Sequence, residues 1–98
     1  MTTRVVNLRR HENYNVYIGR GGPGRSGYFG NPFPIGGIDN KTRAESIVEF
    51  ECYFHDRLQR DPEFKRRVEE LRGRTLGCFC APLPCHGDVI VAYLEYPP

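Results

Sequence analysis

Three of the four cysteines in this chain, together with one histidine, fall within a nine-residue run near its end. The four side chains are Cys78, Cys80, Cys85 and His86. Thiolate and imidazole groups are the ligands that zinc and other borderline cations prefer in proteins. The spacing therefore predicts a metal site made by these four residues, with zinc as the ion. Neighbours such as Cys85 and His86 usually diverge, so one of the four could instead support a ligand without binding the ion. The ion would then have three protein ligands and an open position.

The same run supports a hypothesis without a metal. A cysteine at the first turn of a helix lies near unpaired amides and the positive end of the helix dipole, which lower its pKa. Cys85 would then be a reactive thiolate and His86 its assisting base, so the two are candidate catalytic residues. A third interpretation treats the cysteines as small buried apolar side chains and His86 as a helix cap.

A long segment rich in glycine and proline, residues 20–39, is the second candidate for chemistry. Glycine lets a backbone approach a ligand closely and present its amides to a phosphate, and arginine adds positive charge. The segment has no Lys-Ser/Thr ending, so it is not a P-loop. The residues that we expect to bind such a ligand are Arg20, Arg25, Gly30, Asn31 and Asp88.

The elements that must position these residues follow from local patterns. Residues 4–8, 15–19 and 75–80 are β-branched or aromatic runs typical of strands. Thr42 and Glu45 form a capping box at the start of a helix, whose inward stripe we expect to be Ala44, Ile47, Val48, Phe54 and Leu58. Asp61 and Pro62 begin a second helix that Gly73 ends, and a closing helix spans 89–96 and stops at Pro97.

This order of elements predicts a small α/β or α+β domain, with one sheet of three or more strands and about three helices packed on it. If residues 75–80 are a strand, Cys78 and Cys80 share a face, and the prolines at 82 and 84 stiffen the turn that returns Cys85 to it. Cys52 lies far away in the first helical pattern, where we expect a buried core thiol.

Length and composition set the class of protein. The chain has 98 residues, so we expect one domain spanning residues 1–98. No apolar run is long enough to cross a bilayer, and the start of the chain is not a signal peptide, which predicts a cytoplasmic protein with no membrane partner. The net charge is only +2, which gives little support to a nucleic-acid partner, although all basic residues but Lys41 and Lys65 are arginine.

Several motifs together resemble one family of unknown function. They are the segments Val5-Val6-Asn7, Val16-Tyr17-Ile18-Gly19-Arg20 and Gly30-Asn31-Pro32-Phe33, Leu71-Arg72-Gly73, and the run from Cys78 to Asp88. This order and spacing resembles the family catalogued as domain of unknown function 4326, over nearly the whole chain. The resemblance implies a bacteriophage or its bacterial host as the source, so we expect the bacterial host cell as the location, and it implies no particular reaction.

Three hypotheses on function remain open at this point. The first is a zinc-binding module whose glycine-rich loop binds a phosphate-bearing ligand, either a nucleotide or nucleic acid. The second is an enzyme that uses Cys85 or a zinc-bound water on a nucleotide-like substrate. The third is a module that binds or inhibits a host protein through an exposed aromatic loop.

Overall fold

The computed structural model describes residues 2–22, 24–33, 35–36, 38, 40–80 and 83–96. The elements follow the order β1 (Arg4–Asn7), a 3₁₀ turn (Leu8–Arg10), β2 (Val16–Tyr17), α1 (Arg43–Arg60), α2 (Pro62–Glu69), β3 (Thr75–Cys78) and α3 (His86–Glu95). The predicted α/β class is confirmed. The strands are shorter than predicted, and α3 begins three residues before position 89.

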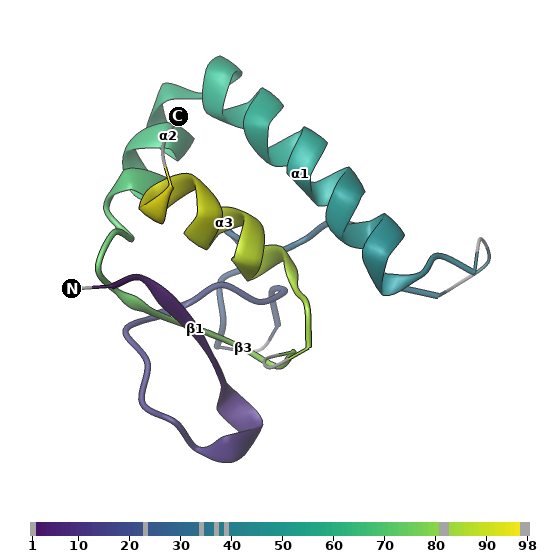
Figure 1. The fold of residues 1–98 in the computed structure, drawn as a ribbon, viewed down its shortest axis with the longest axis horizontal. Coiled ribbons are helices and arrows are strands. Elements are labelled where there is room, and N and C mark those ends of the chain that lie inside the picture. The colour runs from purple at the N-terminus through teal and green to yellow at the C-terminus, as the bar shows by residue number, and fades with distance from the viewer. Residues whose placement is uncertain are drawn as a thin grey trace.

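All three strands are parallel, with β3 in the middle of the order β1-β3-β2. Their carboxyl ends therefore meet at the same edge of the sheet, where open sheets of this kind bind ligands. In Figure 1, α3 lies over β1 and β3, and α1 and α2 lie beyond it on the same side. Within the described residues, no helix is long and apolar enough to cross a membrane.

The predicted signals at the starts of α1 and α2 are confirmed. Thr42 accepts a hydrogen bond from the Glu45 amide (3.1 Å), and the Glu45 side chain accepts one from the Thr42 amide (3.0 Å). Asp61 caps α2, which begins at Pro62. Gly73 has the predicted left-handed backbone, with φ +80°, but α2 already ends at Glu69, so the prediction that Gly73 ends this helix is wrong. The proposed stop at Pro97 lies outside the described residues.

The inward face of α1 differs from the prediction. Its buried residues recur every four positions, at Ser46, Phe50, Phe54 and Leu58, whereas Val48 is 60% exposed and Ala44 is exposed. The prediction followed apolar residue type alone and missed a serine whose hydroxyl is satisfied inside the protein. The prediction for Cys52 is also wrong, because this thiol is exposed on the outer side of α1.

Below α1, the core joins the helices to the sheet. Three fully buried phenylalanines, Phe50, Phe54 and Phe64, pack at ring distances of 5.6 and 5.8 Å. Ile18, Leu76 and Ile90 bring in the sheet and α3. Gly87 allows α3 to approach the sheet, because a Cβ there would lie 2.8 Å from side-chain carbons of Ile18 and Val5. This close packing fixes the first turn of α3 over the carboxyl edge of the sheet.

Candidate functional site

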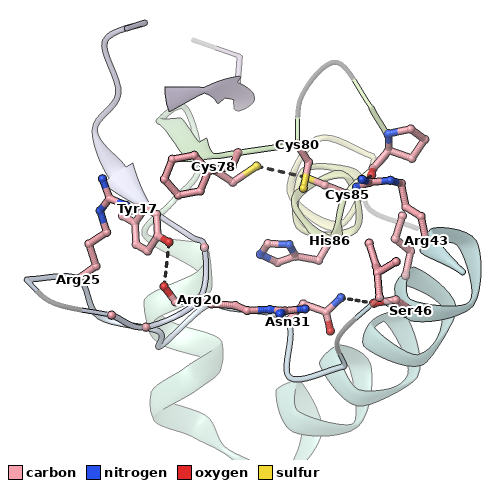
Figure 2. Close-up of a pocket in the computed structure, with 17 residues that line it drawn as sticks. Tyr17, Arg20, Arg25, Asn31, Arg43, Ser46, Cys78, Cys80, Cys85 and His86 are labelled. Carbon is pink, nitrogen blue, oxygen red and sulfur yellow. Dashed lines mark hydrogen bonds between the residues drawn. The ribbon is translucent and has the colours of Figure 1, made fainter. Parts of the chain in front are cut away.

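A cavity of about 420 Å³ lies at the carboxyl edge of the sheet. Its walls come from the ends of β2 and β3, the loop after β2, and the first turns of α1 and α3. Figure 2 shows Tyr17 and Arg25 on one side, Arg43 and Ser46 on the other, and His86 between them. The residues that line it are Tyr17, Gly19, Arg20, Gly21, Gly22, Arg25, Asn31, Ile35, Arg43, Ser46, Ile47, Cys78, Phe79, Cys80, Pro84, Cys85 and His86.

The three cysteines of the predicted metal site line this cavity, and two of them lie close together. The sulfurs of Cys78 and Cys85 lie 3.6 Å apart and both residues are buried, whereas Cys80 is half-buried. Within the described part of the chain, no group of three or more His, Cys, Asp or Glu side chains is placed to hold a metal ion. The four-ligand zinc site therefore stays a prediction. Pro82, one of the two turn prolines, lies outside the described residues.

Cys85 caps α3 with its sulfur. The thiol accepts a hydrogen bond from the Gly87 amide (3.2 Å), and the Asp88 carboxylate accepts one from the Cys85 amide (3.0 Å). The hydrogen bond with Cys78 and burial raise the pKa of the Cys85 thiol, although the Gly87 amide acts in the opposite direction. The lowered pKa that the helix N-terminus predicted is therefore wrong: a thiol partner and desolvation outweigh one amide.

His86 is buried. Its Nε2 lies 2.6 Å from the carbonyl oxygen of Ile18, and its ring meets Phe50 edge-on at 5.0 Å. Burial lowers the pKa of His86, while its hydrogen bond to Ile18 raises it and the charge of Arg20 lowers it further. A neutral imidazole that donates to the Ile18 carbonyl fits these surroundings. Metal binding through Nε2 would break that bond.

The glycine-rich loop folds back on itself. Gly22 and Arg25 exchange backbone hydrogen bonds of 3.1 and 2.9 Å, and the Gly30 amide donates to Gly27 (2.9 Å). A Cβ on Gly27 would lie 2.6 Å from the Gly21 nitrogen, and one on Gly30 would lie 2.8 Å from the Gly19 oxygen. Glycines here let two backbone segments pack together, and several amides are already used within the loop.

The predicted ligand-binding residues divide between the cavity and its surroundings. Arg20, Arg25 and Asn31 line it, whereas Gly30 lines a neighbouring cavity of about 470 Å³ that shares Arg20, Gly21 and Asn31. Asp88 is exposed and serves as the cap partner of Cys85. Asn31 also holds the wall together, because its Nδ2 donates to Ser46 Oγ (2.9 Å) and its Oδ1 accepts from the Phe33 amide (2.8 Å).

The sequence interpretation missed Arg43, Ser46 and Phe79. Arg43 is the first residue of α1, and its guanidinium donates to the Pro84 carbonyl (3.1 Å), which joins α1 to the turn before α3. The sequence could have indicated Arg43 as a candidate, because the helix dipole disfavours a cation in the first turn and such a residue needs another reason to be there. Ser46 is buried and donates to the Phe33 carbonyl. No local pattern could have brought Ser46 next to Asn31.

Charge in the cavity has one sign. Arg20, Arg25 and Arg43 line it, and no acidic residue does so among the described positions. None of the ion pairs formed within the described ranges involves these three arginines. Figure 2 shows the Arg20 side chain extending under His86 towards Asn31. The backbone carbonyl of Arg20 accepts a hydrogen bond from the Tyr17 hydroxyl (2.8 Å). The arrangement can therefore accept an anion.

Comparisons with known proteins agree with the resemblance. The family model described as "Domain of unknown function (DUF4326)" matches residues 5–96. The chain is 38% identical over 87 residues to a protein of enterobacteria phage T4, described as an uncharacterised 12.4 kDa protein in the nrdA-td intergenic region. That match covers 89% of this chain and 72% of the phage protein. No solved structure matches. The chain belongs to the family of the domain of unknown function DUF4326.

Proposed function

We propose that the cavity at the carboxyl edge of the sheet binds a small phosphate-bearing ligand. The observation that carries the proposal is the set of three arginines without an acidic partner among the described residues. Guanidinium groups match phosphate oxygens in geometry and charge. The cavity volume of about 420 Å³ also fits a small molecule, since ligand pockets commonly enclose 300 to 1,000 Å³.

The local surroundings favour binding by arginine side chains rather than by the first turn of α3. The amides of Gly87 and Asp88 already donate to Cys85, and the Asp88 carboxylate stands at that turn. The surroundings of Cys85 also favour ligand binding over covalent catalysis by this residue, because its thiol is buried, bonds to Cys78 and has a raised pKa. Reactive cysteines instead need the thiolate and access to solvent.

Titration calorimetry tests the proposal with inorganic phosphate, pyrophosphate, a set of nucleotides and a short single-stranded oligonucleotide. Arg20→Ala should weaken binding of the phosphate compounds by about 1.5 to 3 kcal/mol, the range for a charge-assisted hydrogen bond. Arg60→Ala is the matched control, because Arg60 lies on the far end of α1 and pairs with Asp56. Parent protein that binds none of these compounds would refute the proposal, as would equal binding by the Arg20 variant.

As a second candidate function, we propose that the cysteines bind a zinc ion. One distance supports this proposal. Two thiolates on one tetrahedral zinc lie about 3.8 Å apart when each Zn–S bond is about 2.3 Å. The sulfurs of Cys78 and Cys85 are separated by 3.6 Å. Cys80 and His86 would have to turn towards them to complete the site, and His86 would keep its bond to Ile18 only by binding the ion through Nδ1.

Elemental analysis of protein purified without chelators should then give about one zinc per chain. Cys78→Ser should remove the metal and lower the melting temperature, because metal-binding energy is folding energy in a small domain. Cys52→Ser is the control, since this exposed thiol is not part of the cavity. Metal-free protein, or a Cys78 variant with unchanged stability, would exclude a structural zinc.

A further inference from the structure

One wall of the cavity is a stack of an arginine on two aromatic rings. The guanidinium carbon of Arg25 lies 5.2 Å from the centre of the Tyr17 ring and 5.0 Å from that of Phe79. The two rings meet edge-on, with centres 6.3 Å apart. All three residues line the cavity. The wall therefore offers flat, polarisable surface together with positive charge.

Each member of this wall is held by the fold. Tyr17 ends β2 and Phe79 follows β3 directly, so the register of two paired strands sets their positions. Arg25 is fixed at its backbone by the two hydrogen bonds with Gly22. The Tyr17 hydroxyl also donates to the Arg20 carbonyl, which couples this wall to the neighbouring arginine. A surface held in this way loses little freedom when a ligand stacks on it.

The neighbouring cavity also has aromatic rings and an arginine, but there these groups serve the fold. Arg57 donates to the Tyr53 hydroxyl (2.9 Å), pairs with Asp61 (3.4 Å) and lies 4.0 Å from the ring centre of Phe64. It also lies over Tyr28, at 4.9 Å. In contrast, no acidic residue pairs with Arg25 within the described ranges. The wall at Phe79 is therefore the better candidate for a ligand.

We infer that the ligand is a nucleoside monophosphate whose base stacks on the wall of Tyr17, Phe79 and Arg25 while its phosphate faces Arg20 and Arg43. This inference rests on the proposed function and adds the planar ring to the phosphate. Tyr17 and Arg25 lie opposite Arg43 across the cavity in Figure 2, so the base and the phosphate have separate sides. Stacking on an aromatic ring depends little on which base the nucleotide carries, because every base has a π-face.

Calorimetry with the four common ribonucleoside monophosphates and ribose 5-phosphate tests the inference. At least one nucleotide should bind the parent about 10-fold or more tightly than ribose 5-phosphate, as expected for one stacked base. Phe79→Leu keeps an apolar side chain but removes one of the two rings, so it should reduce this preference and leave the affinity for ribose 5-phosphate unchanged. Arg9→Ala is the matched control, because Arg9 also lies over Phe79 (5.7 Å) but does not line the cavity.

The two proposals fail in different ways. Equal binding of ribose 5-phosphate and all nucleotides, or equal weakening of both by Phe79→Leu, overturns the ring subsite and leaves phosphate binding in place. Absence of binding by every phosphate compound overturns both. If Phe79→Leu does not fold, nuclear Overhauser effects in the parent protein decide instead. Contacts from base protons to the rings of Tyr17 and Phe79 are expected, and contacts only to Tyr28 and Tyr53 would overturn the inference.

Discussion

The two ends of α1 use arginine in opposite ways. At the carboxyl end, Arg57 pairs with Asp61 and Arg60 pairs with Asp56, and both cations lie where the helix dipole favours positive charge. At the amino end, Arg43 stands in the first turn, where the dipole disfavours it, and it has no acidic partner within the described ranges. It lines the cavity and donates to the Pro84 carbonyl instead.

This difference separates residues that serve the helix from residues that serve the cavity. The same pairing with acids occurs on α2, where Arg66 bonds Glu63 and Glu70, and Arg67 also bonds Glu63. A formal net charge of +2 hides the contrast, because the paired arginines cancel against acids while those of the cavity do not. Location, rather than the abundance of arginine, points to an anionic ligand.

The largest effect that we expect at the amino end comes from Ser46→Ala. Ser46 is buried, accepts from Asn31 Nδ2 and donates to the Phe33 carbonyl. Removal of the hydroxyl leaves both groups without this partner, which should cost about 1 to 3 kcal/mol of the free energy of unfolding. Urea denaturation measures the change, and Cys52→Ala on the exposed side of α1 should stay within about 0.5 kcal/mol. Equal losses for both variants would show that Ser46 does not hold the wall.

Features that depend on neighbours in sequence could be predicted, and those at the cavity wall could not. The capping box of Thr42 and Glu45, the Asp61-Pro62 helix start and the left-handed Gly73 each follow from a few adjacent residues. The contact between Asn31 and Ser46 joins residues 15 apart, and Arg43 reaches Pro84 across 41 positions. Such pairs depend on how α1 lies on the rest of the fold.

The sequence interpretation was wrong at two cysteines, once from residue type and once from helix position. Cys52 is a residue type that is usually buried, yet the 46-50-54-58 row of α1 turns it outward. The first turn of a helix usually lowers the pKa of a cysteine, but at Cys85 the Cys78 thiol and burial raise it. At Cys52 the deciding factor is which face of α1 is buried, and at Cys85 it is the neighbouring thiol, so residue type or helix position considered alone gave the wrong prediction.

Arg43→Ala tests the amino end of α1 and should have an effect of intermediate size on ligand affinity. We expect about 10-fold weaker binding of a nucleoside monophosphate, since one charge-assisted contact to phosphate is lost. Stability should change by less than about 0.5 kcal/mol, because loss of the bond to the Pro84 carbonyl is offset by removal of a cation from the helix amino end. Calorimetry and urea denaturation of the same preparation measure the two quantities. Unchanged affinity would exclude Arg43 from the ligand site.

The smallest effect belongs to the carboxyl end, where Arg60 and Asp56 form an exposed i, i+4 pair with an N–O distance of 2.5 Å. The side chains are 61% and 59% exposed, so water and salt weaken their attraction. A double-mutant cycle with Arg60→Ala and Asp56→Ala should give a coupling of about 0.3 to 0.5 kcal/mol at low salt, falling towards zero in 1 M sodium chloride. Ligand affinity should be the same in all four proteins. Any loss of affinity in Arg60→Ala would mean that arginines outside the cavity also attract the ligand, and the contrast between the two ends of α1 would fail.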